Sequence, residues 1–295
     1  MAVAPRALIV TRPTEYDELL GRHGSRQQVA FFLEQRGQSL DELDRRHAAQ
    51  TAAVQAVSAA IPVDWRRASL SRADLDRFVF GPEDVVIAVG QDGLVANVAK
   101  YLQGQRVVGV NPDPARNPGV LVRHPAGDVA ALLRQLAGGA AALEARAMVQ
   151  ITLDDGQELV ALNEIFVGDR GHQSARWNIT VDGQSEQQSS SGLIVGTGTG
   201  ATGWCASIDR ERDGAVELPA PQSTELAWFV REAWPSPWTG TTLTAGRLAN
   251  GELVLRCESD RLVAFGDGIE DDHLDLAWGQ TATITLASTA LVLVV

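Results

Sequence analysis

The segment between residues 85 and 110 limits the possible folds of this chain more than any other. It opens with the apolar run Val85-Val86-Ile87-Ala88-Val89, whose length and β-branched composition are typical of a buried strand. Residues 94–102 then carry apolar side chains at helical spacing, and Val107-Val108-Gly109-Val110 has the composition of a second strand. A strand, a helix and a strand within about 25 residues form a βαβ unit, so we expect a parallel sheet with a right-handed crossover.

The turn Gly90-Gln91-Asp92-Gly93 joins the first of these strands to the helix. Glycines let the backbone turn sharply and approach a ligand closely. Asp92 therefore stands at the carboxyl end of a strand, where open α/β sheets bind their ligands. Two interpretations are open. An aspartate before a helix caps free backbone N–H groups, whereas a carboxylate held at a strand end orients or deprotonates a hydroxyl, which contributes about 10² to 10⁴ in rate.

The length of the chain favours two domains. Its 295 residues with 45% hydrophobic content are enough for two separate cores. Before the βαβ unit, residues 6–10 have the composition of a strand, and residues 27–35 and 40–60 that of helices. After a further helix at 128–136, the small and flexible run Gly138-Gly139-Ala140-Ala141-Ala142 marks a boundary. We therefore predict an α/β domain over residues 1–138 and a second domain over residues 139–295.

The second half of the chain has a mostly β texture. Short runs with strand-like composition, separated by turns such as Asp155-Gly156, occur at residues 147–153, 158–167, 177–181, 252–257, 262–265, 281–286 and 290–295. A second glycine loop, Gly196-Thr197-Gly198-Thr199-Gly200-Ala201-Thr202-Gly203, follows the apolar run Leu193-Ile194-Val195. Two such loops on one chain indicate phosphate or nucleotide handling.

Composition excludes several classes of partner. The formal net charge is -12 and no local basic patch interrupts it, which argues against nucleic acid and anionic membranes. The two cysteines and the histidines lack disulfide or zinc spacing, and the acidic stretch at residues 270–273 is interpreted as a solvated loop, so no metal site is predicted. The first apolar stretch is too short for a signal peptide, and no later one approaches a membrane span. We expect a cytoplasmic protein with small-molecule partners.

The pair Asn163-Glu164 lies in an apolar context that predicts a half-buried strand. An amide and a carboxylate there are costly unless partnered, so they either satisfy each other and the backbone or face a ligand. In the second interpretation they suit vicinal ribose hydroxyls. The threonines of the second glycine loop are similarly either turn residues or donors to phosphate and base edges.

Two common nucleotide-binding motifs are absent. No glycine loop ends in the Gly-Lys-Ser/Thr of a Walker motif, so this is no ordinary P-loop kinase. The first strand is not followed by G-x-G-x-x-G, which disfavours a dehydrogenase. Phosphoryl transfer is compatible with the absence of both motifs, because it needs little more than a positioned carboxylate, Mg²⁺ and backbone donors around the phosphates.

Four motifs, taken in order and spacing, resemble the NAD kinase family. They are Gly90-Gln91-Asp92-Gly93, Val108-Gly109-Val110-Asn111, Leu162-Asn163-Glu164 and the stretch from Gly192 to Gly200. The similarity extends from about residue 6 to residue 284 and is greatest to the mitochondrial-type branch, which has counterparts of the helix around His47 and of residues 109–114. No Arg/Ser-rich transit segment accompanies it, which favours a bacterial-type cytosolic protein or a processed form.

The resemblance implies a fold, a reaction and a set of residues. The fold would be an α/β Rossmann-like amino-terminal domain and a β-rich, β-sandwich-like carboxyl-terminal domain, as in NAD and diacylglycerol kinases. The reaction would be Mg²⁺-dependent transfer of the γ-phosphoryl group of ATP to the adenosine-ribose 2′-hydroxyl of NAD, in a homodimer or a higher homo-oligomer. Asp92 would be the catalytic residue. The nucleotide-binding residues would be Gly90, Gln91, Gly93, Asn163, Glu164, Thr197, Thr199, Gly200, Thr202 and Trp204, the last stacking on a base or nicotinamide.

Several positions depart from the family pattern. Gln91 replaces the second of two glycines that usually precede the aspartate, and Leu94 stands where a threonine is common. Ser191 occupies the place of an aspartate that reads adenine in typical bacterial members, and Gly198 replaces a common proline. Two alternatives therefore stay open: a kinase of the same fold that acts on another nucleoside, sugar or lipid hydroxyl, and a catalytically weakened NAD(P)-binding sensor.

Overall fold

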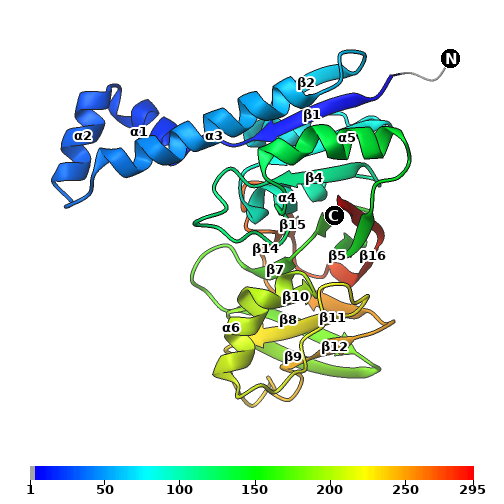
Figure 1. Ribbon diagram of the computed structural model, residues 1–295. Helices are drawn as coiled ribbons and strands as arrows, with labels where there is room; N and C mark the ends of the chain where they lie inside the picture. The colour runs from blue at the N-terminus through cyan, green and yellow to red at the C-terminus, as the bar shows by residue number, and fades with distance from the viewer. Residues whose placement is uncertain (1–3) are drawn as a thin grey trace. The chain divides into compact units, whose positions relative to one another are not determined.

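The computed structural model describes residues 4–295, which form two compact units (Figure 1). The first comprises residues 4–144 and Val292–Val295, and the second comprises Ala145–Leu291. The predicted domain boundary between residues 138 and 139 stays a prediction, because the limits of these compact units do not show which segments fold independently. The fold class is confirmed, because the first unit is α/β with a parallel sheet and the second is built from antiparallel strands.

The sheet of the first unit is wholly parallel. Its strand order is β2-β1-β3-β4, and the end of the last strand, β16, pairs with β4 through Val292 and Leu293. The strands are β1 (Arg6–Thr11), β2 (Arg66–Ser71), β3 (Asp84–Val89) and β4 (Arg106–Val110). Every residue of β3 is buried, as its β-branched composition predicts for a strand covered on both faces.

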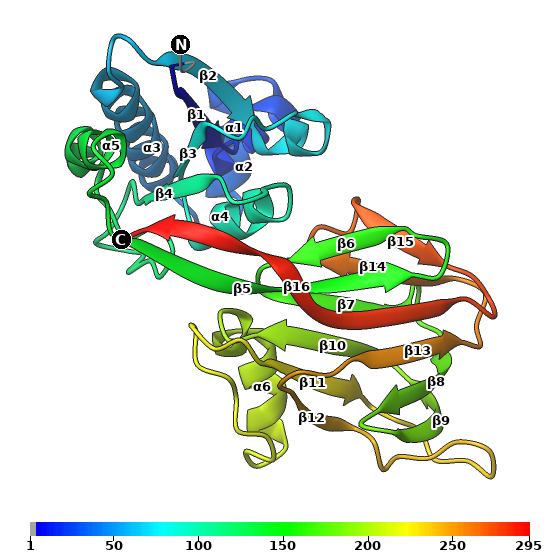
Figure 2. The same cartoon turned by 90° about the vertical axis from the view of Figure 1, so that its right-hand side faces the viewer.

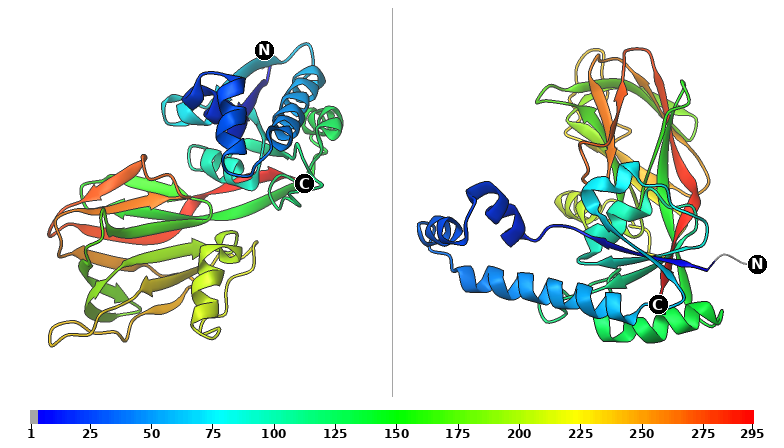
Figure 3. Two further views of the ribbon diagram at one scale, coloured as in Figure 1. Left: turned by 90° about the vertical axis from the view of Figure 1, so that its left-hand side faces the viewer. Right: turned by 90° about the horizontal axis from the view of Figure 1, so that it is seen from above.

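Helices cover both faces of this sheet. On one face, α3 (Leu40–Ala60) and α5 (Val129–Ala137) lie side by side and bury Ala53, Val57 and Leu133 against the strands (Figure 3). The other face of β3 and β4 is contacted by α4 (Asp92–Ala99), which in turn contacts the 3₁₀ helix η1 (Arg72–Arg77). A second 3₁₀ helix, η2 (Ala126–Asp128), leads into α5. Both faces are thereby kept from water, as parallel sheets require.

Two short helices gather at the amino-terminal end of α3 (Figure 1). They are α1 (Glu15–His23) and α2 (Arg26–Glu34), and they share the apolar cluster of Leu19, Val29, Leu33 and Leu43 with α3. A capping box at Thr14 and Asp17 fixes the first turn of α1. No helix within residues 4–295 combines the length and the apolar character that crossing a membrane requires.

The second unit is a sandwich of two sheets. One sheet follows the order β12-β11-β10-β7-β14-β15, with strands Ala245–Leu248, Leu226–Arg231, Gly192–Thr197, Glu164–Asp169, Leu262–Gly266 and His273–Leu276. The other joins β16, β13, β8 and β9 in that order, with β5 on β16 and β6 on β5. Its strands are Thr281–Val294, Leu253–Cys257, Ala175–Val181, Gln184–Ser190, Leu143–Leu153 and Glu158–Ala161.

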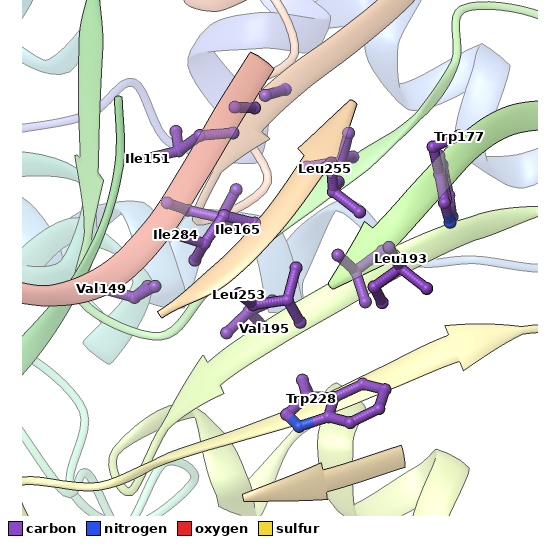
Figure 4. Packing of buried hydrophobic residues seen from close by; sticks show 14 of the residues in the cluster. Val149, Ile151, Ile165, Trp177, Leu193, Val195, Trp228, Leu253, Leu255 and Ile284 are labelled. Atoms are coloured by element: carbon purple, nitrogen blue, oxygen red, sulfur yellow. The ribbon is translucent and has the colours of Figure 1, made fainter. Parts of the chain in front are cut away.

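The inner faces of these sheets form one apolar core (Figure 4). Trp177, Leu255 and Ile151 from one sheet meet Leu193 and Trp228 from the other. The 3₁₀ helix η3 (Gly200–Thr202) and α6 (Trp204–Glu211) follow β10, and α6 covers the outer face of β10 and β11 (Figure 2).

Three predicted strands are wrong in detail. The run at residues 158–167 is not one strand but two, β6 and β7, with a bend at Leu162 and Asn163 between them. The runs at 281–286 and 290–295 form the single strand β16. The bend removes Asn163 from the ladder and leaves Glu164 as the first residue of β7.

Candidate functional site

In the first unit, the Asp92 carboxylate is held by a loop that returns to it. Asp92 is the first residue of α4, and the cap position is taken by Gln91, which makes no side-chain cap bond. The carboxylate instead accepts the backbone N–H groups of Val120, Leu121 and Val122 at 2.8 to 3.1 Å. Its Oδ1 accepts from all three residues and its Oδ2 only from Val120. The side chain is therefore no helix cap, and Oδ2 keeps the greater spare capacity to accept a hydroxyl proton.

Glycines let this loop reach Asp92. A Cβ at Gly109 in β4 would lie 2.1 Å from the carbonyl oxygen of Leu121, a distance that no side chain tolerates. Gly119 has φ of +65°, in the left-handed region that glycine occupies without strain. At the base of the loop, the Asn111 amide donates to the carbonyl of Asn117 at 2.6 Å. Close packing on β4 and on Asp92 thus fixes residues 119–122.

The predicted residues beside Asp92 have distinct surroundings. The Gly90 N–H donates to the carbonyl of Val110 at 3.0 Å, which ties the turn to β4. A Cβ at Gly90 would come within 3.2 Å of Leu94, whereas one at Gly93 would meet nothing within 4 Å. The Gln91 side chain, which departs from the family pattern, is exposed.

In the second unit, Asn163 and Glu164 lie where the chain bends between β6 and β7. Asp267, in the turn after β14, accepts the N–H groups of Leu162 and Asn163 at 2.8 and 2.7 Å. The carbonyl of Asn163 accepts the Thr197 N–H at 2.8 Å. The backbone of this bend is therefore fixed from two directions, and the Asn163 and Glu164 side chains are left half-buried.

Glu164 is in an environment that disfavours its charge. Burial raises the pKa of the Glu164 carboxyl to about 7, and the negative charge of Asp267 adds to the effect. Within residues 4–295 no group donates a hydrogen bond to this carboxyl that would lower its pKa. The neighbouring Cys205 thiol is inert, because burial raises its pKa to about 12.

The glycine loop after β10 packs against the same bend. The Thr197 hydroxyl donates to the Leu162 carbonyl at 2.6 Å and accepts the N–H groups of Thr199 and Gly200. A Cβ at Gly200 would lie 2.2 Å from the Asn163 carbonyl oxygen. The Thr202 hydroxyl donates to the Thr199 carbonyl at 3.3 Å, while the Thr199 hydroxyl reaches the Pro221 carbonyl at 3.5 Å. These hydroxyls hold the loop together, as expected if the threonines are turn residues.

Trp204, the first residue of α6, belongs to an aromatic hollow. Its ring is stacked on Phe166, with centroids 5.9 Å apart and planes 9° from parallel. The Arg231 guanidinium carbon lies 5.4 Å from the Trp204 centroid. The remaining lining residues, mostly charged, are Asp169, Arg170, Val263, Phe265, Glu270, Asp271 and His273. Apolar rings rimmed by charges suit a flat aromatic ligand that carries polar groups.

Comparison with known proteins finds similarity to NAD kinases. Over 132 residues the chain is 32% identical to an NAD kinase of Cupriavidus pinatubonensis, covering 42% of each. Over 263 residues it is 28% identical to the mitochondrial NAD kinase 2 of Rattus norvegicus, covering 72% of this chain and 62% of that one. Both relatives are named NAD kinases, and the chain is similar to them at modest identity. No family model matches it.

Solved structures of NAD kinase family proteins share the fold. Yeast NADH kinase complexed with NADH matches with a TM-score of 0.64 and 12% identity, over 100% of this chain and 84% of that one. An NAD kinase from Archaeoglobus fulgidus in complex with ATP matches with a TM-score of 0.59 and 16% identity, over 98% and 93%. The chain spans 42% and 62% of the length of the two curated NAD kinases above, so the activity is a proposal.

The predicted site residues fall into two groups. Gly90, Gln91, Asp92 and Gly93 lie in the first unit, and the remaining seven lie in the second. Sequence reasoning missed Phe166, whose ring stacks on Trp204. It also missed that Asp267 accepts backbone N–H groups of the bend before β7, although the Asp-Gly sequence at 267–268 indicates a turn there. Within residues 4–295 no group of three or more His, Cys, Asp or Glu side chains is arranged to hold a metal ion.

Proposed function

We propose that this protein is an NAD kinase, which transfers the γ-phosphoryl group of ATP to the adenosine-ribose 2′-hydroxyl of NAD and yields NADP. The observation that carries the proposal is the Asp92 carboxylate, anchored at the carboxyl end of β3, whose Oδ2 accepts one N–H group and has capacity for a hydroxyl as well. Similarity to proteins named NAD kinase supports the choice of acceptor. Phosphoryl transfer requires mainly positioning and charge stabilisation, so one oriented carboxylate suffices on the acceptor side.

The other residues would bind the nucleotides. Gly90 and Gly93 leave room for phosphates beside Asp92, with the Gln91 side chain near them. Asn163 and Glu164 would hold ribose hydroxyls, because their side chains emerge from a bend whose backbone is already satisfied. The loop of Thr197, Thr199, Gly200 and Thr202 would shape the dinucleotide site. Magnesium, when bound with ATP, neutralises charge on the transferred phosphoryl group.

A second candidate keeps the chemistry and changes the acceptor. The exposed Gln91 side chain adds bulk where the family has glycine, and Ser191 lacks the carboxylate that reads adenine. Both changes favour another nucleoside or sugar hydroxyl, and a third candidate, a sensor that binds NAD(P) without turnover, follows from the same two positions. A homodimer and a cytoplasmic location are further proposals, which a sedimentation measurement and cell fractionation test.

One assay separates the candidates. Purified protein is incubated with MgATP and with NAD, NADH, nucleosides or sugars, and ADP release and the mass gain of the acceptor are recorded. Phosphorylation of NAD above the other acceptors supports the NAD kinase. Preferred phosphorylation of another acceptor supports the second candidate, and dinucleotide binding without turnover on any acceptor leaves the sensor.

The aromatic hollow yields a prediction for dinucleotide binding. Trp204→Ala should weaken NAD binding by about two- to tenfold, because it removes one stacking surface, while Trp204→Phe should retain most of the affinity. Isothermal titration calorimetry with NAD measures the change. Trp278→Ala is the matched control, since Trp278 is 63% exposed and does not line the hollow. Equal losses in the Trp204 and Trp278 variants would remove Trp204 from the site.

A further inference from the structure

The aromatic hollow of the second unit has a floor of fixed rings. A Cβ at Gly168 or at Gly192 would lie 2.3 or 2.4 Å from the Phe166 ring, so two glycines let this ring lie against the sheet. The Phe265 centroid is 5.0 Å from that of Phe166, and the Trp204 centroid is 5.9 Å from it. The three rings share a hollow of about 410 Å³, a volume typical of a site for one small ligand.

The described lining of the hollow is acidic. It holds the carboxylates of Asp169, Glu270 and Asp271 and the guanidinium groups of Arg170 and Arg231. Arg170 lies 4.0 Å from Asp275, which is outside the lining, so part of its charge is offset there. Because arginine can only donate, His273 Nε2 accepts the bond from Arg170 at 2.9 Å and adds no positive charge. The balance of charge in the hollow is therefore negative.

Among the described residues, three charged side chains of the hollow have no hydrogen-bond or ion-pair partner. They are Arg231, Glu270 and Asp271, of which the last two are exposed. The Arg231 guanidinium carbon lies 5.4 Å from the Trp204 centroid and is held by that ring alone. The aromatic face thus carries a cation that a ligand can displace, beside carboxylates with which a cationic ligand can pair. Proteins bind organic cations with such groups of aromatic rings.

We infer that this hollow binds the nicotinamide ring of the dinucleotide and that Glu270 and Asp271 make it select NAD over NADH. The nicotinamide ring is positively charged in NAD and neutral in NADH, whereas the rest of the two molecules is identical. The aromatic rings and the carboxylates attract the charged form, and Arg231 opposes it. This assignment rests on the proposed function for the identity of the ligand as a dinucleotide, and it adds the redox form that the site prefers.

Paired affinities for NAD and NADH test the inference without turnover. In the double variant Glu270→Gln/Asp271→Asn, the ratio of the Kd of NADH to the Kd of NAD should fall by about three- to tenfold, because the carboxylates that favour the charged ring are gone. Arg231→Gln should raise the same ratio by about two- to fivefold, because it removes the competing cation. Isothermal titration calorimetry of the full chain measures both constants. Misfolding would weaken both ligands alike, so shifts in opposite directions report on the ring charge.

ADP-ribose shows which part of the dinucleotide the hollow holds. It lacks the nicotinamide ring, so its affinity should follow that of NADH, and not that of NAD, in the carboxylate and arginine variants. An ADP-ribose affinity that follows NAD would mean that these side chains act on the adenosine half or on the phosphates, and would overturn the inference.

Matched controls separate the hollow from general charge effects. Glu252→Gln and Arg256→Gln remove the same kinds of charge from exposed positions of the second unit outside the hollow, and both should leave the ratio of the two constants unchanged. An unchanged ratio in the hollow variants, or an equal shift in the controls, overturns the inference, even if NAD is phosphorylated. The expected shifts without phosphorylation of NAD would instead reject the proposed function and leave the dinucleotide site standing.

Discussion

Asp92→Asn should lower kcat for NAD phosphorylation by at least about 100-fold, with a much smaller loss of NAD affinity. An amide cannot take the hydroxyl proton, but its oxygen can still accept the N–H groups that now bind Oδ1. The bond between Oδ2 and the Val120 N–H is lost, and the amide NH2 that takes the place of Oδ2 faces that N–H. The substitution therefore removes the base and leaves most of the loop anchor, which makes it a test of chemistry more than of structure. Steady-state kinetics at saturating MgATP measure it.

Two further variants make this result interpretable. Asp92→Ala removes the anchor as well as the base, so it should lower the melting temperature further than Asp92→Asn and mobilise residues 119–122, which hydrogen exchange detects. Asp74→Asn, at an exposed position in η1, should leave kcat unchanged. Wild-type turnover in Asp92→Asn would show that the carboxylate serves only to hold the loop.

The anchor itself was beyond the reach of sequence reasoning. The donors to Asp92 are backbone N–H groups of residues about thirty positions later. Nearly every residue has a backbone N–H group, so the sequence does not show which of them will bind a given carboxylate. Only Gly109 and Gly119 hinted at a close approach, and without the fold nothing linked them to Asp92. The sequence therefore predicted a carboxylate at the end of β3, but not that a loop binds it.

Elements with a strong local signal were predicted well. The helix at 40–60 and the strands at 85–89 and 107–110 agree with α3, β3 and β4 within a residue or so, because a long alanine-rich segment strongly favours helix and β-branched runs strongly favour strand. The short helix α1 was not predicted. It buries only Leu19, and contacts with α2 and α3 stabilise it.

Polar strands were harder to predict. In β9, which lies at the edge of its sheet beside β8, only Gln188 and Ser190 are buried, and the sequence Gln-Ser-Glu-Gln-Gln-Ser-Ser lacks any apolar alternation. Pairing with β8 holds it, and so do two bonds of the Gln188 amide, which accepts the Trp177 indole N–H and donates to the Leu243 carbonyl. Tertiary hydrogen bonds of this kind override the low strand propensity of the segment, and no local sequence pattern predicts them.

Glu164 gives the second large effect, which is a dependence of stability on pH. Its pKa in the folded protein is about 7, above the ordinary value of an exposed glutamate. Between these two values the folded state holds a proton that the unfolded state has released, so stability falls as pH rises through this window and is constant above it. Glu164→Gln cannot ionise. Its stability relative to the wild type should therefore increase by about 1 to 3 kcal/mol between pH 5 and pH 8.

Denaturant unfolding at a series of pH values measures this difference. Glu252→Gln, which removes an exposed carboxylate of the second unit, should change stability equally at every pH in the window. Parallel pH profiles for the wild type and Glu164→Gln would show that burial does not hold this carboxyl neutral.

The same carboxyl links stability to binding if Glu164 accepts a ribose hydroxyl. The ionised form is the stronger acceptor, so NAD should bind more tightly as pH rises through 7, in the range where the free protein is losing stability. Binding near pH 6.5 should therefore release a fraction of a proton, which calorimetry detects as a dependence of the apparent enthalpy on the ionisation enthalpy of the buffer. Glu164→Gln should abolish that dependence. Proton release that persists in the variant would place the titrating group elsewhere and remove Glu164 from the ribose site.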